Sequence, residues 1–183
     1  DVRVALFSVV FALFGSYTGT KTVLLFNADF LRYILVFLLP IITVFSLLKK
    51  NVGIENNSNS FSLGKRMLIS AISALLIGFY DGFFGPGTGT FLILIYTMLL
   101  KYDFVTANGN AKVINSSSNI AALLGFLLHG KILLLIAIPA AIAGIAGNLL
   151  GSKLVVKRGS KFIRPVFISV FALLFFKIIY DLI

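Results

Sequence analysis

The sequence lacks several residues on which other classes of protein depend. It contains no cysteine, which excludes disulfide bridges and thiolate metal sites. Its one histidine, His129, cannot form a histidine metal site, so the sequence predicts no metal and no other cofactor. Charged residues make up only 12% of the 183 residues, against about 25% in a soluble domain. Hydrophobic residues make up 59% of the chain, and this balance indicates a membrane protein.

Acidic residues are also few, and the formal net charge is +10. In a soluble protein such an excess would suggest nucleic acid as a partner. Here the basic residues fall mostly between apolar runs, as they do at the ends of membrane helices. We therefore expect membrane lipids as neighbours and no nucleic acid.

The apolar residues form runs of the length that crosses a bilayer, which takes about 20 helical residues. In chain order these runs are Val4 to Gly19, Leu31 to Leu48, Met67 to Phe84, Pro86 to Leu100, Ala111 to Leu128, Ile132 to Leu150 and Ile163 to Ile183. The run from Pro86 is short, which leaves open whether it crosses or is re-entrant. The predicted fold is all-α, a polytopic bundle of transmembrane helices.

Small residues recur at four-residue spacing in two of these runs. Gly15 and Gly19 form one pair, and Ala143, Gly147 and Gly151 form a second stripe. Such spacing lets the backbone of another helix approach closely. We expect both stripes to be helix-packing faces.

Residues 78–90 interrupt the apolar pattern with glycines, a proline and a carboxylate. Glycine weakens a helix and proline removes a backbone donor, so the helix from Met67 should unwind near Asp81 and a new one should begin at Pro86. Broken helices of this kind carry substrate sites in transporters, and the free amides at a helix N-terminus attract anions. Asp81 has two readings, as a cap on those amides or as an ion-coupling group.

The segment from Lys101 to Asn119 is too polar to face lipid along its length. In a helix from Ala111 to Leu128, one face would carry Lys112, Asn115, Ser116 and Asn119. Lys112 could snorkel to the interface, pair with Asp81 or oppose the charge of a substrate. The asparagines are equally suited to interhelical hydrogen bonds and to ligand contacts. The predicted substrate-binding residues are Asp81, Gly85, Gly87, Thr88, Thr90, Lys112, Asn115 and Asn119, and no catalytic residue is predicted.

The order of features repeats within the chain. Residues 3–48 and 131–182 both have a basic start, a span ending in spaced glycines, a polar turn and an apolar–Arg pair that opens the next span. We therefore divide the chain into residues 1–50, the C-terminal part of a first repeat, residues 51–66, a loop, and residues 67–183, a second repeat with one helix broken at 81–86. The first repeat has no broken-helix unit before it, so we expect roughly 65 further residues upstream of Asp1.

The basic loops predict the orientation. Both Lys49 to Arg66 and Gly151 to Arg164 are rich in Lys and Arg and should face the cytoplasm. The turn between Lys21 and Arg32 should then be external, although its partner in the second repeat is internal. The two repeats are therefore predicted to be inverted, which is common in secondary transporters.

Several motifs together resemble the C-terminal part of the TauE/SafE family. They are residues 78–89, Ala111 to Asn115 with Ser118 and Asn119, Gly130-Lys131, residues 147–152 and Ile163-Arg164-Pro165. The resemblance implies a multi-pass permease of the bacterial plasma membrane that exports sulfite, an organosulfonate or another small organic acid. Coupling to protons or cations and assembly as a homodimer are compatible with it.

Other classes fit less well. An intramembrane enzyme would need a nucleophile with a base, or metal ligands, and we expect no second buried carboxylate to pair with Asp81. A structural membrane protein would not need a Gly-Pro break beside a polar helix face. An anion channel remains the main alternative, because a polar broken helix could line a pore.

Overall fold

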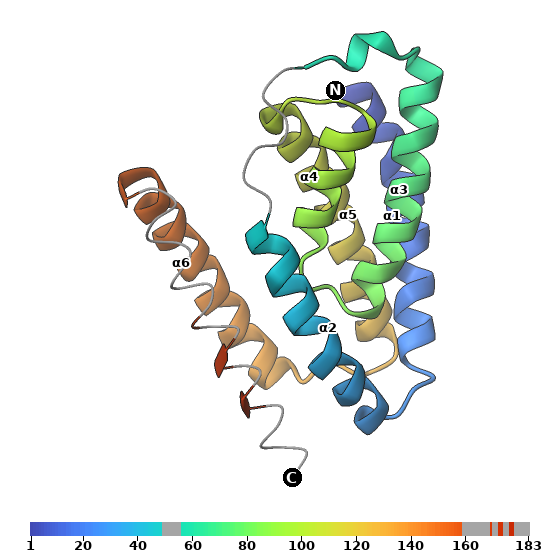
Figure 1. The fold of residues 1–183 in the computed structure, drawn as a ribbon. Coiled ribbons are helices and arrows are strands. Elements are labelled where there is room, and N and C mark those ends of the chain that lie inside the picture. Colours follow the sequence, from blue (N-terminus) through green and yellow to red (C-terminus); the bar gives the residue numbers. More distant parts are fainter. Residues whose placement is uncertain (49–55, 159–168, 170–171, 174–175, 178–183) are drawn as a thin grey trace.

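The computed structural model of this protein describes residues 1–48, 56–158, 169, 172–173 and 176–177. Within them the regular elements are helices throughout, which confirms the all-α prediction (Figure 1). They are α1 (Val2–Val23), α2 (Ala28–Leu48), the short 3-10 helix η1 (Ser58–Ser60), α3 (Leu63–Phe83), α4 (Thr88–Leu99), α5 (Phe104–Leu128) and α6 (Leu134–Arg158). The predicted run from Ile163 to Ile183 falls outside the described residues except at five positions.

Within the described residues, four helices are long and apolar enough to cross a membrane by length and composition: α1, α3, α5 and the part of α6 from Leu134 to Gly151. Helix α4 is apolar but has only 12 residues. At 1.5 Å per residue it extends about 18 Å, against roughly 30 Å of hydrocarbon. The run from Pro86 was expected to be short, and α4, which forms from it, is indeed too short to span the hydrocarbon core on its own.

Polar side chains fix where the central helices begin. The Ser62 hydroxyl accepts a hydrogen bond from the Lys65 amide at 3.4 Å at the start of α3. Asp103 accepts one from the Thr106 amide at 3.0 Å at the start of α5. These are N-caps, which satisfy amides that lack a partner in the first turn. Because of the Asp103 cap, α5 begins at Phe104 and not at Ala111 as the sequence pattern suggested.

Helix α1 packs most extensively on α3, and glycines on both helices bring their backbones together. A Cβ atom built on Gly19 would overlap the Phe79 carbonyl, and one built on Gly82 would overlap the Ser16 carbonyl. The predicted Gly15 and Gly19 packing face is therefore confirmed. Its partner face on α3 contains Gly78 and Gly82.

Helices α4 and α5 complete a four-helix unit with α1 and α3. Its buried apolar core consists of Ala12, Ala74, Leu92, Tyr96, Leu100, Tyr102, Ala107, Ala111 and Ile114. The Ser70 hydroxyl bonds Ser8 at 2.7 Å and Tyr96 at 3.0 Å, which links α1, α3 and α4 through buried polar atoms. The small side chains of α5 face this unit.

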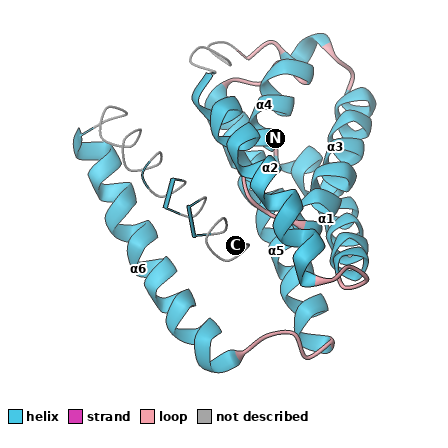
Figure 2. Ribbon diagram, turned by 60° about the horizontal axis from the view of Figure 1, so that its bottom comes forward, coloured by secondary structure: helices cyan, strands magenta, loops and turns pink. Residues whose placement is uncertain are grey.

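Helix α6 lies apart from the four-helix unit (Figure 2), and neither α2 nor α6 packs extensively on that unit. A Cβ built on Gly147 or Gly151 would meet nothing within 4 Å among the described residues. The predicted packing stripe on α6 thus has no partner among the described residues, and it stays a prediction.

The helix directions agree with the predicted alternation of loops. In Figure 1, α3 begins and α6 ends toward the top, whereas α1 and α5 end toward the bottom. Near the top, the Asn57 amide donates to the Lys101 carbonyl at 2.9 Å, which ties the start of α3 to the end of α4. The loops around residue 60 and residue 129 therefore lie at opposite ends of the bundle.

We expect a cysteine at Ser60 to resist an impermeant thiol reagent in intact cells and a cysteine at His129 to react with it. Both positions are exposed, and the chain contains no cysteine that would add background. Ser58 is less suitable as a reporter because it is buried. Labelling at both sites, or at Ser60 alone, would contradict the predicted orientation.

The packing of α1 on α3 predicts a contrast between two glycines of α3. Gly82→Ala should destabilise the protein by about 1–3 kcal/mol, because the new methyl group overlaps the α1 backbone. Gly64→Ala is the matched control, since a Cβ there meets nothing within 4 Å. Thermal unfolding in detergent measures both, and equal midpoints for the two variants would show that the helices can move apart at little cost.

Candidate functional site

The break between α3 and α4 is a sharp reversal. Gly85 and Gly87 have φ values of 85° and 84°, in the left-handed region that favours glycine. The Tyr80 hydroxyl donates to the Pro86 carbonyl at 2.6 Å and holds the turn against the end of α3. Helix α4 then runs back along α3 (Figure 1). The predicted break exists, but α3 stays helical through Asp81 to Phe83 and the new helix begins at Thr88.

The Asp81 side chain is buried at this reversal, with 8% of its surface exposed. Its Oδ1 accepts a hydrogen bond from the Thr88 hydroxyl at 2.6 Å, and its Oδ2 accepts one from the Ser118 hydroxyl. These contacts join the end of α3, the start of α4 and the middle of α5. The N-cap of α4 is Gly87, without a side-chain bond. Asp81 therefore does not cap α4 in this structure, because its described donors are hydroxyl groups and not backbone amides.

Helix α1 supports the same cluster from the other side. The Ser16 hydroxyl donates to the Ser118 carbonyl at 2.5 Å, and the Thr20 hydroxyl donates to the Gly82 carbonyl at 3.3 Å. Sequence reasoning did not select Ser118 as the partner of Asp81. The signal was available, because Ser118 follows Ala107, Ala111 and Ile114 at heptad spacing on the buried face of α5.

The first turn of α4 leaves two backbone donors free. The Thr88 amide donates to the Gly85 carbonyl at 3.3 Å, and the Phe91 amide donates to the Gly87 carbonyl at 3.0 Å. The amides of Gly89 and Thr90 between them donate to no described residue. Both residues are partly exposed, so these donors and the positive end of the helix dipole can act on a ligand.

The polar residues predicted on α5 lie on a different side from Ser118. Lys112 and Asn119 are exposed, and Asn115 is partly buried. The Asn115 carbonyl accepts hydrogen bonds from Ser118 at 3.0 Å and from the Asn119 amide group at 2.7 Å. The structure thus brings Asp81, Gly85 and Thr88 together. It links Asn115 to them through Ser118, and it shows no contact between Lys112 and Asp81.

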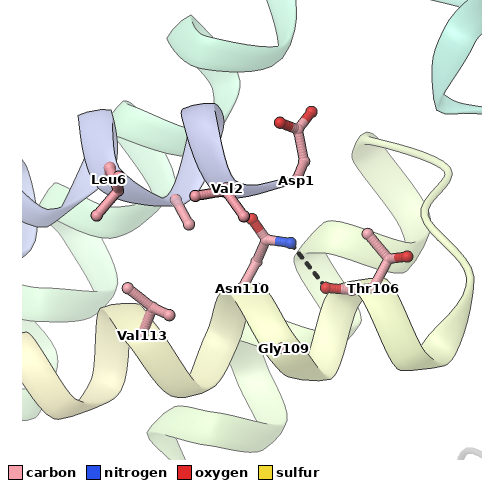
Figure 3. A pocket seen from close by; sticks show the side chains of 8 residues that line it. Asp1, Val2, Leu6, Thr106, Gly109, Asn110 and Val113 are labelled. Atoms are coloured by element: carbon pink, nitrogen blue, oxygen red, sulfur yellow. Dashed lines mark hydrogen bonds between the residues drawn. The ribbon is translucent and has the colours of Figure 1, made fainter.

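A separate cavity of about 280 Å³ lies between the start of α1 and α5 (Figure 3). Asn110 is 3% exposed there, and its side-chain amide donates to the Thr106 carbonyl at 2.8 Å. Its Oδ1 has no partner among the described residues. Since Asn110 precedes Ser118 by two turns of α5, this cavity is distinct from the Asp81 cluster. In the described part of the chain, no three His, Asp or Glu side chains gather as metal ligands would.

Comparison with known proteins gives one consistent family. Residues 1–178 match the family described as sulfite exporter TauE/SafE. The "Probable membrane transporter protein YfcA" of Escherichia coli K12 is 34% identical over 177 residues, which cover 95% of this chain and 64% of that protein. A "Probable membrane transporter protein" of Haemophilus influenzae is 32% identical over 181 residues, which cover 99% of this chain and 70% of that protein. This chain therefore spans less than two thirds of the length of YfcA. No solved structure matches it.

The reversal predicts that two glycines only two residues apart respond differently to alanine. Gly87→Ala should destabilise the protein by about 1–2 kcal/mol, because a Cβ is strained at a φ of 84°. Gly89→Ala should cost less, since Gly89 has open space around it and lies in the first turn of a helix. Denaturation in detergent compares the two. A Gly87→Ala variant as stable as Gly89→Ala would mean that the turn adopts another conformation.

Proposed function

This chain belongs to the sulfite exporter TauE/SafE family, and on that basis we propose that it is part of a secondary transporter for a small anion in the bacterial cell membrane. The substrate class is sulfite, an organosulfonate or another small organic acid, and the direction is export. The observation that carries the proposal is the helix reversal with two free amides in the first turn of α4.

The anion in this proposal binds at the N-terminus of α4. The backbone from Gly85 to Thr90 lies there, and the amides of Gly89 and Thr90 offer two donors to oxygen atoms of the substrate. Gly85 and Gly87 carry no side chain, and their left-handed conformations make the turn that precedes these donors. Thr88 and Thr90 flank Gly89 in the first turn of α4. A sulfonate or sulfite group, with several oxygen atoms on one centre, can accept hydrogen bonds from two neighbouring amides.

Lys112, Asn115 and Asn119 form the second part of the proposed site. Lys112 lies eight residues after the first residue of α5, within a candidate membrane span, and its side chain is exposed. A lysine near the centre of a span costs about 3 kcal/mol if it faces lipid. Its presence there therefore favours a wet or protein-lined surface on this side of α5. An anion at that surface would be the natural partner for its charge.

The inverted-repeat arrangement belongs to the same proposal. Residues 1–50 would belong to a first repeat, residues 51–66 would contain a cytoplasmic loop that ends where α3 begins at Leu63, and residues 67–183 would form the second repeat. In such transporters the two broken helices face each other across the substrate, and one repeat rocks against the other. The reversal between α3 and α4 would then be one half of the transport site.

Transport by the full-length protein in liposomes tests the proposal. Uptake of labelled sulfite, an alkanesulfonate and a small carboxylate should saturate for at least one of them. Lys112→Met should lower that uptake by about 10- to 100-fold, because a hydrogen bond to a charged group contributes about 1.5–3 kcal/mol. Lys131→Met is the control, since Lys131 is exposed in the loop after α5.

Three results would count against this function. Uptake of none of the anions would overturn the transporter assignment. Flux that rises linearly with concentration would identify a channel. Equal loss of uptake in Lys112→Met and Lys131→Met would show that Lys112 acts through the net charge of the protein and not through contact with the anion.

A further inference from the structure

Asp81 is buried, and among the described residues no Lys or Arg side chain forms an ion pair with it. This arrangement indicates a role beyond holding the helices together. Among the residues that the structure describes, it is the only buried acid. The ion pairs there join Arg32 to Asp29 and Arg66 to Asp1, so neither includes Asp81. Its two oxygen atoms accept hydrogen bonds from hydroxyl groups and from no described backbone amide. A permanently ionised carboxylate buried in this way would be costly.

None of the charged groups on the surrounding helices forms an ion pair with Asp81 among the described residues. On the helices of the four-helix unit they are Arg3, Tyr17 and Lys21 of α1, Lys65, Arg66 and Tyr80 of α3, Tyr96 of α4 and Lys112 of α5. Among the described residues, none of these cations forms an ion pair with Asp81, and the hydroxyl hydrogen of the neighbouring Tyr80 is used by the Pro86 carbonyl. No described positive charge therefore fixes Asp81 in its ionised form.

Each hydroxyl beside Asp81 lies between two acceptors. The Thr88 Oγ1 is 2.6 Å from Asp81 Oδ1 and 2.6 Å from the Gly85 carbonyl. The Ser118 Oγ contacts Asp81 Oδ2 and lies 3.0 Å from the Asn115 carbonyl. A hydroxyl carries one hydrogen and can accept as well as donate, so each can turn from one acceptor to the other.

This arrangement satisfies Asp81 in both of its protonation states. When the carboxylate is ionised, the Thr88 and Ser118 hydroxyls both donate to it. When it is protonated, the new O–H donates to the Ser118 Oγ, and the Ser118 hydrogen turns to the Asn115 carbonyl. Only hydrogen positions change between the two states. A residue that served packing alone would not need such a reversible set of partners.

We propose that Asp81 is the proton-binding site of the transport cycle, taking up one proton from water as its carboxylate becomes a carboxylic acid and releasing the same proton later. This inference rests on the proposed anion site at the start of α4. Asp81 bonds Thr88, the first residue of α4, next to the free amides of Gly89 and Thr90. An ionised Asp81 repels an anion at those amides, and a neutral one does not. The anion therefore binds to the protein in which Asp81 is protonated, and the proton and the anion move across the membrane in the same direction.

Infrared difference spectra test the proton site without any transport. Spectra of the full-length protein recorded at two pH values should contain a carbonyl band of a protonated carboxylic acid that Asp81→Asn removes. Asp103→Asn is the matched control and should leave the band in place. Asp103 lies at the surface end of α5, where hydrogen bonds from Thr106 lower its pKa and keep it ionised. A spectrum in which Asp81→Asn changes no such band between pH 4 and 10 would overturn the proposal.

Anion binding tests the coupling. In the wild-type protein the affinity should fall by about tenfold per pH unit once Asp81 is ionised in the free protein, because binding then takes up one proton. The affinity of Asp81→Asn should not change with pH, whereas Asp103→Asn should follow the wild type. Equal pH dependence in the wild type and Asp81→Asn would overturn the coupling and leave the transporter assignment intact. A protein that binds no anion at any pH, yet shows the infrared band, would overturn the proposed function and keep the proton site.

Discussion

The close approach of α1 to α3 is the contact on which the described structure depends. Gly15 and Gly19 on one helix and Gly78 and Gly82 on the other remove the side chains that would hold the backbones apart. Short hydroxyl side chains of α1 bond both of the helices on which it packs, Ser16 to α5 and Thr20 to the end of α3. Helix α1 is thereby bonded to two of the three helices that meet at Asp81.

Buried hydroxyl groups follow from this packing at two levels of the bundle. At one level Ser8, Ser70 and Tyr96 join α1, α3 and α4. At the other, Ser118 and Thr88 hold Asp81 between α3, α4 and α5. Hydroxyls suit such positions because one group both donates and accepts, and unpaired polar atoms are costly away from water. The Asp81 level differs from the Ser8–Ser70–Tyr96 level because it contains an acid, and a buried acid indicates a functional site.

Local sequence features predicted some parts of the site better than others. The break was visible because glycine and proline act on the backbone wherever they stand, and the left-handed Gly85 and Gly87 are its direct result. The partner of Asp81 was not selected, because the polar segment of α5 offers Asn115, Ser116, Ser118 and Asn119 within two turns, and only the heptad spacing of the buried face distinguishes Ser118. The α6 stripe shows the converse case, a packing pattern without a described partner.

The sequence by itself determined the all-helical class, the apolar runs typical of a membrane protein, a helix break near Asp81 and the family that the chain resembles. These properties depend on composition, on local backbone preferences and on motif order. Only the tertiary structure decided that Asp81 bonds Ser118 and Thr88, and that Lys112 is exposed. The reason is geometric: a shift of one residue turns a helix face by about 100°, and the packing of α5 on α1, α3 and α4 decides which of its faces is turned inward.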